Sequence, residues 1–503
     1  MIGQATEGRE IIGLLKNTPI YFIGNVLNRL GAFLLIPLYT HYLTTDQYGI
    51  LELVLVSVAL IRAFLGLNLS HATLRFYFEY KTKEDKDQLV STMVIFTALW
   101  CLAFFAIFFL ISKSFSIWIA QTADHATLFL LAFMLLCFEV VSEIPFAILR
   151  ANGRSALFVA ASGINLLLRV GINIYLVAIL QKGVEGILIG NVIAASLICL
   201  FLLASTLKNI RLKYDHPKMV VLMKYSLPLA LASIPGLLIK NADRLFLGRY
   251  ASLTALGLYA LAIRFGMILE GFVLEPFYLG FGPFRFSIID REDAKQTLAV
   301  LMTYFTFLLS FVSLVIILFS PFLIALIATE SFYDAHKIVP PLILATALQG
   351  THYLFQSGIL IAKKTKVIPP ISAASAALNL FALYFLIPRF GVLGAAMAAV
   401  AANLLNAALT YRLSQRYYPI PYEWGRLTKI VGAACLIYGL SLVPLGFGFW
   451  GGVFIKLLGL LLFLALLFLM NVPTQEEREK IIVFKKRIGA FFMRSNTMRM
   501  EEP

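Results

Sequence analysis

Charged side chains stand inside long apolar stretches of this chain, where one charge costs roughly 2.5–3.5 kcal/mol on membrane-insertion scales. Such residues are expected to face one another or a water-filled cavity. The basic residues of this kind are Arg29, Arg62, Arg169, Lys240, Arg244 and Arg264, and the polar Asn25 stands close to Arg29. The acidic residues are Glu52, Glu139, Glu143, Asp243, Glu270 and Glu275.

The basic set predicts an anionic cargo. Arginine presents a planar fork of hydrogen-bond donors that suits phosphate oxygens. Lys240 and Arg244 are four residues apart and share a helix face, as do Asn25 and Arg29. We therefore expect these side chains to line a wet, net basic cleft that binds the cargo.

The same charges have a structural alternative, in which they pair with one another and only hold helices together. The pairs considered are Asp243 with Arg244 or Arg264, and Glu52 with Arg29 or Arg62. For Glu139 and Glu143, which stand near a helix end, the structural role is favoured.

The elements that carry these residues are membrane-spanning helices. Hydrophobic residues make up 60% of the 503 residues and charged residues only 14%, whereas a soluble domain is about a quarter charged. Segments of about 20 apolar residues are long enough to cross a bilayer. They predict an all-α polytopic membrane protein with about fourteen spans, at 13–41, 48–70, 89–112, 126–150, 156–180, 184–206, 220–248, 254–282, 297–319, 338–362, 367–388, 391–412, 427–446 and 452–472.

Lysine and arginine positions predict the orientation of these spans. The net charge is +15, and the basic residues gather in alternate short loops, as the positive-inside rule requires. With an even number of spans, both termini are expected to be cytoplasmic. The same distribution argues against a nucleic-acid partner, which would need a basic stripe on a folded domain.

An internal repeat divides the spans. Tyr42 to Gly49 leads into the second span, and Tyr250 to Gly257 leads into the eighth, 208 residues later. The same offset relates Gly183-Val184-Glu185-Gly186 to Gly391-Val392-Leu393-Gly394. Six spans per copy place both copies in the membrane in the same sense, related by an axis along the membrane normal.

The repeat predicts two pseudo-symmetric six-helix lobes around a central cleft. The expected N-lobe is 1–212, the C-lobe is 213–420, and an added helix pair is 421–472. Residues 473–503 are expected to form a cytoplasmic, basic amphipathic tail, because Pro473-Thr474-Gln475-Glu476-Glu477 reads as a capping box. Such a helix lies on the membrane surface and binds anionic lipids.

Enzyme signatures are absent from the sequence. It has no Gly-rich phosphate loop, no nucleophile elbow and no His or Cys group with metal-ligand spacing. The acidic runs 84–87 and 290–293 lie in loops too short to build a sugar-nucleotide site. We therefore expect a transporter without a metal or an organic cofactor.

Several runs resemble the polysaccharide-biosynthesis flippases, the O-antigen and capsule-unit translocases of bacteria. In the first half these are Asn28-Arg29-Leu30, Leu35-Ile36-Pro37-Leu38-Tyr39 and Leu43-Thr44-Thr45-Asp46-Gln47-Tyr48-Gly49. In the second half they are Tyr225-Ser226-Leu227-Pro228-Leu229, Asp243-Arg244-Leu245-Phe246-Leu247-Gly248 and Gly257-Leu258-Tyr259-Ala260-Leu261-Ala262.

This resemblance implies the multidrug, oligosaccharidyl-lipid and polysaccharide exporter superfamily, whose members have two six-helix lobes around a V-shaped cleft. It implies a flippase in the bacterial inner membrane that moves an undecaprenyl-diphosphate-linked oligosaccharide outward by alternating access, for lipopolysaccharide or capsule assembly. A basic residue at the position of Arg29 is expected in this family. A polysaccharide polymerase and a chain-length regulator are the expected partners. Proton or sodium coupling is also implied, with Glu52, Asp243 or Glu270 as candidate residues.

Other functions stay open. A lipid II flippase of peptidoglycan synthesis would also have a basic cleft, whereas a multidrug cation antiporter would have an acidic, aromatic one. An accessory membrane subunit of a polysaccharide synthase would share the helices without transporting anything. A membrane glycosyltransferase would need a larger soluble or re-entrant domain than these loops provide.

Overall fold

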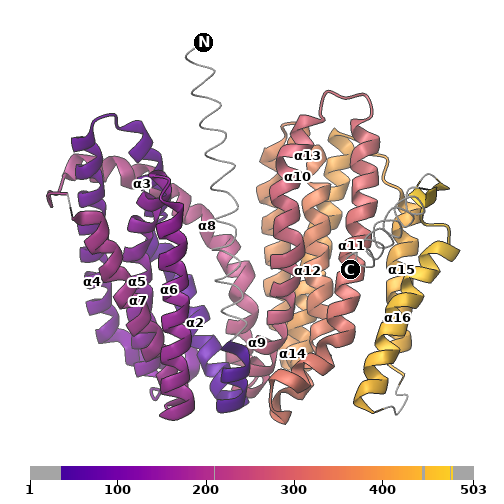
Figure 1. Ribbon diagram of the computed structural model, residues 1–503, viewed down its shortest axis with the longest axis horizontal. Coiled ribbons are helices and arrows are strands. Elements are labelled where there is room, and N and C mark those ends of the chain that lie inside the picture. Colours follow the sequence, from indigo (N-terminus) through magenta and orange to yellow (C-terminus); the bar gives the residue numbers. More distant parts are fainter. Residues whose placement is uncertain (1–34, 209, 444–447, 476, 480–503) are drawn as a thin grey trace, which may run out of the picture. The chain divides into compact units, whose positions relative to one another are not determined.

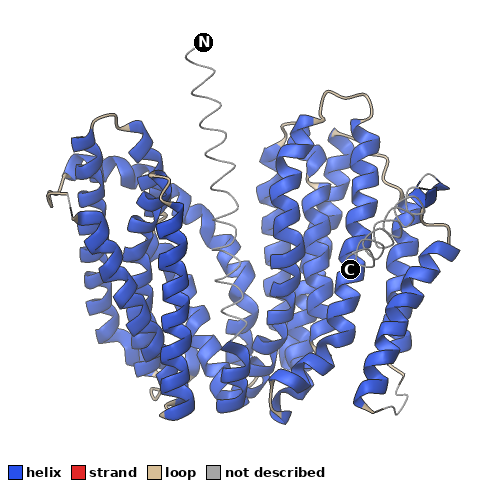
Figure 2. Ribbon diagram, in the orientation of Figure 1, coloured by secondary structure: helices blue, strands red, loops and turns tan. Residues whose placement is uncertain are grey.

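The computed structural model describes residues 35–208, 210–443, 448–475 and 477–479, and these ranges contain only helices and loops (Figures 1 and 2). The chain is thus an all-α protein in its described part, as the sequence predicts. The helices in chain order are α2 Thr45–Gly66, α3 Leu69–Glu79, α4 Lys83–Ala120, α5 Ala126–Ala151, α6 Ser155–Asn173, η1 Ile174–Ile179, α7 Gly183–Leu207, α8 His216–Tyr250, α9 Leu253–Leu269, η2 Glu270–Leu274, α10 Glu275–Ser287, α11 Ala294–Ile327, η3 Glu330–Lys337, α12 Val339–Phe355, α13 Ser357–Ile361, η4 Thr365–Val367, α14 Ile368–Tyr417, α15 Trp424–Ser441 and α16 Phe449–Leu469.

Every predicted span from 48–70 onward overlaps a helix. Two of them, 367–388 and 391–412, lie in α14, where Gly391 has φ 55° and breaks the helix between them. In the described part of the chain, nine helices are long and apolar enough to cross a membrane, and ten if one bent pair is a single span. The chain is a multi-pass membrane protein, and the count of fourteen spans stays a prediction. The first span, 13–41, lies mostly outside the described residues.

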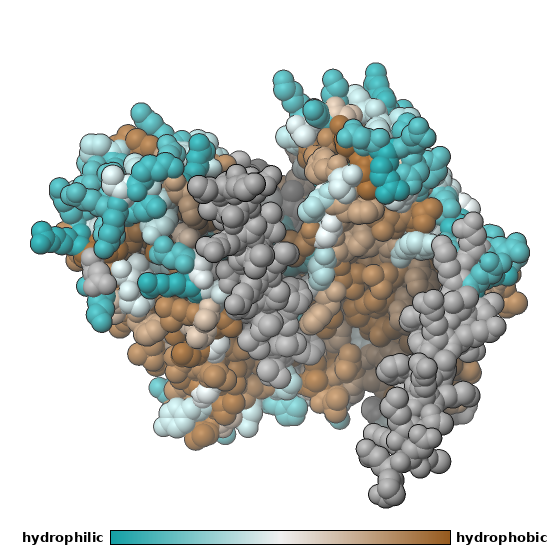
Figure 3. Space-filling view, turned by 45° about the horizontal axis from the view of Figure 1, so that its top comes forward, coloured by the Kyte–Doolittle hydropathy of each residue, from teal (hydrophilic) through white to brown (hydrophobic). Residues whose placement is uncertain are grey.

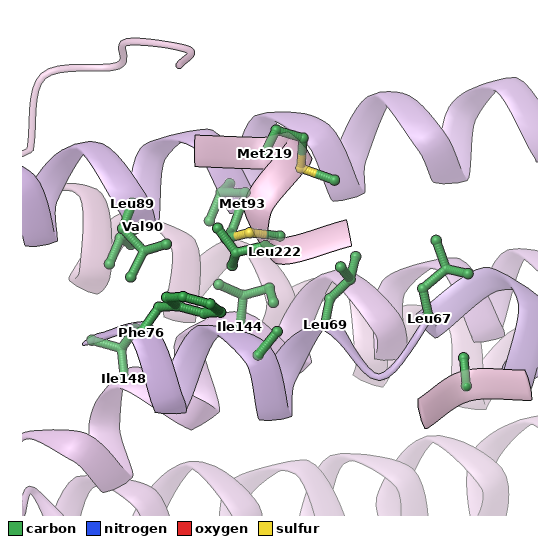
Figure 4. Packing of buried hydrophobic residues seen from close by; sticks show 13 residues of the cluster. Leu67, Leu69, Phe76, Leu89, Val90, Met93, Ile144, Ile148, Met219 and Leu222 are labelled. Carbon is green, nitrogen blue, oxygen red and sulfur yellow. The ribbon is translucent and has the colours of Figure 1, made fainter. Parts of the chain in front are cut away.

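One gap between the predicted spans needs correction. The span bounds leave residues 71–88, between the spans 48–70 and 89–112, as a loop, but most of the helix α3 lies there. Leu67 and Asn68 have positive φ angles of 46° and 51°, and they separate helix α2 from helix α3. Apolar side chains on α3 meet side chains of α4, α5 and α8 in one buried cluster (Figure 4). Burying this apolar face stabilises a helix where charge alone indicates a loop.

The helices pack into two compact units, described here one at a time. In the described chain, the first unit comprises residues up to Gly271 together with Leu323–Thr346 and Lys366–Asn406. The second comprises Phe272–Phe322, Ala347–Thr365 and the described residues from Ala407 onward. The lobe boundaries at 212 and 420 stay predictions.

Large apolar side chains cover the outer surfaces of many helices. Leu110 of α4 is 82% exposed and Leu326 of α11 is 72% exposed. In the space-filling view, hydrophobic residues gather along the helix sides and hydrophilic ones near many helix ends (Figure 3). An apolar surface of this extent is unstable in water and suits a lipid environment.

Backbone geometry supports the internal repeat. The N-cap of α2 is Thr44, which forms a capping box with Gln47. The repeat-related N-cap of α9 is Ser252, whose hydroxyl accepts from the backbone of Ala255. Further along the two copies, the repeat-related glycines Gly183 and Gly391 adopt φ angles of 54° and 55°. A positive φ favours glycine, which explains why both positions have it.

The repeat-related helices α2 and α9 touch through two glycines within the first unit. A Cβ added at Gly49 would lie 2.0 Å from the carbonyl oxygen of Leu253, and one at Gly257 would lie 2.0 Å from that of Thr45. Thr45 and Leu253 are themselves related by the offset of 208, so the contact is reciprocal, as in a two-fold axis. Only glycine permits this backbone approach.

In the second unit, the predicted capping box of the tail is confirmed. The Thr474 hydroxyl accepts from the Glu477 backbone, while the Glu477 carboxylate accepts from the Thr474 backbone at 2.7 Å. The same carboxylate accepts from Tyr304 at 2.6 Å and from Arg426 at 2.7 Å. The apolar face predicted for the rest of the tail lies outside the described residues.

The glycine contact makes a stability prediction. Gly49→Ala and Gly257→Ala are each expected to lower the free energy of unfolding by about 1–3 kcal/mol or more, because the added methyl group overlaps backbone. Reciprocity predicts similar losses for the two variants. Thermal unfolding of the purified protein in detergent measures them.

Gly163→Ala is the matched control, since nothing lies within 4 Å of its added Cβ on α6. Alanine is the better helix former, so this variant is expected to be as stable as the parent or slightly more so. Equal melting temperatures for all three variants would contradict the reciprocal contact.

Candidate functional site

The buried carboxylate of Glu52 joins three helices in the first unit. It stands on α2, one turn beyond Gly49, and its side chain is only 6% exposed. One oxygen accepts from Arg244 Nη1 on α8 at 2.8 Å, and the other accepts from Arg264 Nη2 on α9 at 2.9 Å. A single carboxylate therefore neutralises and orients two guanidinium groups in an apolar environment.

Arg244 is buried and bonded through both terminal nitrogens, Nη1 and Nη2, of its guanidinium. Besides Glu52, it donates from Nη2 to the Lys240 carbonyl at 3.0 Å, and its Nε lies 3.6 Å from Asp243 Oδ1. The Tyr259 hydroxyl donates to the other oxygen of Asp243 at 2.5 Å. Only 6% of the Arg244 side chain is exposed. The contacts of Arg244 and Asp243 suit a role in positioning Glu52.

Arg264 is the more accessible of the two arginines. Its side chain is 27% exposed. It donates to Glu52 through Nη2, its Nη1 lies 3.8 Å from the Met267 sulfur, and it also interacts with the Tyr48 side chain. A guanidinium has five N–H donors, so Arg264 retains donors for a further ligand.

A second ion network joins α2, α5 and α6. Arg62 donates to Glu139 at 3.0 Å and to Glu143 at 2.6 Å. Arg169 donates to the other oxygen of Glu139 at 2.8 Å. Two arginines and two glutamates give the network no net charge, which confirms the structural pairing expected for the glutamates.

Lys240 and Glu270 form a looser pair in the first unit. Their charged atoms are 3.4 Å apart, and the lysine side chain is 60% exposed. An exposed pair at this distance contributes little stability, about 0–1 kcal/mol. Its two partners are therefore free to exchange with other ions.

The structure thus brings together most of the charged residues predicted from sequence. Five of the basic residues predicted for the cleft lie in the described chain, and each of them pairs with a carboxylate. An anionic cargo would therefore have to compete with an acidic side chain. Glu52 pairs with Arg244 and Arg264, whereas the pattern of charges in the sequence favours Arg29 or Arg62 as its partner. Asn25 and Arg29 lie outside the described residues. No group of three potential metal ligands occurs among the described residues.

Sequence reasoning assigned no role to two tyrosines and two asparagines that the structure places near the charged residues. Tyr259 holds Asp243, as described above. Tyr39 accepts from Asn173 Nδ2 at 2.9 Å, and the same amide donates to Asn191 at 3.2 Å. Tyr39 belongs to the run Leu35–Tyr39, and Tyr259 belongs to the run Gly257–Ala262. The family resemblance of these two runs is the sequence signal that could have identified both tyrosines.

Comparisons with known proteins agree with this architecture. No curated protein matches the chain in sequence. The chain resembles the solved structure of the lipid II flippase MurJ in its inward closed conformation, with a TM-score of 0.71, 15% identity, and coverage of 90% of this chain and 99% of that one.

Two multidrug transporters are also similar. An inward-facing MATE family transporter of the MOP superfamily has a TM-score of 0.60 and 14% identity over 77% of this chain and 94% of that one. The Vibrio cholerae MATE transporter VcmN in its bent form has a TM-score of 0.51 and 16% identity over 81% and 98%. At such identities these likenesses show the fold, which is that of a transporter.

The family is shown by a match to residues 14–279, which is more than half of the chain. The matching family is described as polysaccharide biosynthesis protein. This chain therefore belongs to the polysaccharide biosynthesis protein family and has the transporter fold that MurJ and the MATE proteins share.

Proposed function

We propose that this protein is a flippase that moves an undecaprenyl-diphosphate-linked oligosaccharide from the inner to the outer leaflet of the bacterial inner membrane. Its family is described as polysaccharide biosynthesis protein, and its fold resembles that of a lipid II flippase. The observation that carries the proposal is Arg264, a partly exposed arginine held by a buried carboxylate. It offers a fixed cation to a diphosphate inside the membrane.

In the proposed cycle, the diphosphate competes with Glu52 for Arg264. Two phosphate groups carry more charge and more acceptor oxygens than one carboxylate, so they can displace Glu52 from this arginine. Glu52 keeps its bond to Arg244 when this happens, so no carboxylate is left buried without a partner. The exchange lets binding and release proceed without a large desolvation cost.

The remaining cations have graded roles in this proposal. Lys240, which is exposed and loosely paired, adds a second positive charge for the cargo. Arg29 and Asn25 are proposed to complete the site from the first span. Arg62 and Arg169 are tied to Glu139 and Glu143, and they bind cargo only if that network opens.

Coupling to a proton or sodium gradient is part of the proposal. Glu52 and Asp243 are buried and bonded, whereas Glu270 is 25% exposed and its lysine lies 3.4 Å away. Of the three candidates, Glu270 is the easiest for a cation to reach. Cytoplasmic termini, lobes at 1–212 and 213–420, and a polymerase and chain-length regulator as partners complete the proposal.

A lipid II flippase is the second candidate, favoured by the MurJ-like fold over nearly the whole of both chains. Both cargoes carry a diphosphate, so the arginine site does not separate them. Transport of each lipid by the purified protein in vesicles does. A multidrug cation antiporter is disfavoured, because each acidic residue bonded in the described site is matched by a basic partner.

Arg264→Ala is expected to reduce translocation of a fluorescent lipid-linked oligosaccharide in vesicles by about 10- to 100-fold. Losing charge-assisted hydrogen bonds of about 1.5–3 kcal/mol gives this range. The variant should fold, because Glu52 keeps Arg244. Arg264→Lys is expected to restore part of the activity.

The matched control for this measurement is Arg291→Ala, which removes an exposed loop arginine paired with Asp293. Its translocation should equal that of the parent. Full translocation by Arg264→Ala in correctly inserted protein would contradict the proposal that Arg264 binds the diphosphate. Arg29→Ala is expected to behave like Arg264→Ala.

Arg244→Ala is expected to fail at a different step. Removing one partner of a buried ion network costs about 3–5 kcal/mol. Here Asp243 loses its basic partner, while Glu52 keeps only Arg264. The abundance and the melting temperature of the protein should fall, in contrast to Arg264→Ala. A stable Arg244→Ala protein with a selective transport defect would reassign Arg244 to the cargo.

A further inference from the structure

A small cavity in the first unit lies between α5 and α6, away from the paired arginines of α8 and α9. Its volume is about 240 Å³, and it is lined by Glu143, Phe146, Arg150, Phe158, Ser162 and Asn165. Cavities for drug-sized ligands span about 300–1,000 Å³. This one is smaller and suits a single ring.

The floor of the cavity is rigid and apolar. Phe146 and Phe158 pack edge to face with ring centroids 5.3 Å apart. Behind them lie the buried Leu149, Ala161 and Leu202, in a cluster shared with α7. An aromatic floor of this kind offers a flat apolar surface to the C–H face of a ring.

The polar lining combines donors and acceptors. Glu143 accepts hydrogen bonds, the exposed Arg150 donates them, and the buried hydroxyl of Ser162 and the amide of Asn165 do both. The amide oxygen of Asn165 is buried and accepts no hydrogen bond within the described part of the chain. A buried acceptor without a partner is costly, and a rotation of the Asn165 side chain toward the cavity would let a ligand hydroxyl satisfy it.

The charges and polar groups of the lining disfavour a phosphate or an acyl chain as the ligand of this cavity. Its lining contains one carboxylate and one guanidinium, and Glu143 also belongs to the neutral network with Arg62. A phosphate would gain no surplus positive charge there. An acyl chain would place an apolar group against four polar side chains and would leave the Asn165 amide oxygen without a partner. An uncharged ring that carries several hydroxyl groups satisfies both the apolar floor and the polar rim.

We propose that this cavity is a sugar subsite, which binds one uncharged monosaccharide ring of the cargo glycan. The inference rests on the proposed flippase function and deepens it, because it separates recognition of the sugar from recognition of the diphosphate. Glu143 lines the cavity and bonds Arg62 at 2.6 Å, so the cavity adjoins the ion network of α2, α5 and α6. Sugar specificity then lies on α5 and α6.

The test is direct binding of free sugars to the full-length protein in detergent, measured by saturation-transfer NMR. The probes are N-acetylglucosamine, galactose and rhamnose, with glucose 6-phosphate as a charged comparison. At least one neutral sugar should bind at or below about 20 mM, and the phosphorylated sugar should not bind to this cavity. Asn165→Leu should weaken the binding at least about tenfold, as expected when one buried hydrogen bond is lost.

Two further variants keep the test independent of folding. Phe158→Leu keeps an apolar floor but removes the ring surface, and Ser162→Phe fills the cavity. Both should abolish sugar binding in protein whose melting temperature is retained. The control is Asn403→Ala, because the Asn403 amide bonds only within its own helix, to the Ala399 carbonyl at 3.0 Å.

Binding of no neutral sugar, or equal binding by the parent and all three cavity variants, would overturn the sugar subsite. Sugar binding should persist in Arg264→Ala, because that side chain does not line the cavity. Failure of the parent to translocate lipid-linked oligosaccharide, with sugar binding intact, would instead count against the proposed flippase function.

Discussion

The backbones of α2 and α9 meet at Gly49 and Gly257, and the position of Glu52 depends on that contact. Helices that carried side chains at the crossing would stand farther apart. The carboxylate one turn beyond Gly49 would then lie too far from Arg264 for the 2.9 Å bond. The close approach of the two helices at Gly49 and Gly257 therefore makes the ion pair between Glu52 and Arg264 possible.

Low polarity around the bridge explains why charges in this protein come in pairs. An isolated arginine in hydrocarbon has no water to stabilise it, so a neighbouring carboxylate must replace the water. This gives the candidate site its chemical character. In the proposed function, a cargo phosphate would reach cations that are already paired with singly charged carboxylates, so binding would be an exchange of one anion for another.

Much of the fold follows from the sequence. The lengths of the apolar segments locate the helices that the structure describes. The offset between Tyr42–Gly49 and Tyr250–Gly257 identifies the pair of helices, α2 and α9, that cross. The capping box at Thr474 follows from local spacing alone. The pairing of Glu52 with Arg244 and Arg264 could not be derived this way, because it joins three helices, and sequence spacing is informative only within one helix. The helix α3 was missed because its burial against α4, α5 and α8 outweighs its polar composition.

The reciprocal crossing of α2 and α9 has the geometry of a homodimer interface within one chain, because each residue meets the counterpart of its own neighbour. Asp46 and Thr254 are related by the repeat and hydrogen-bond to each other across the crossing. In a pair of identical chains, this place would hold two like residues. Because both copies belong to one chain, their residues can differ, and here one is the acceptor and the other the donor.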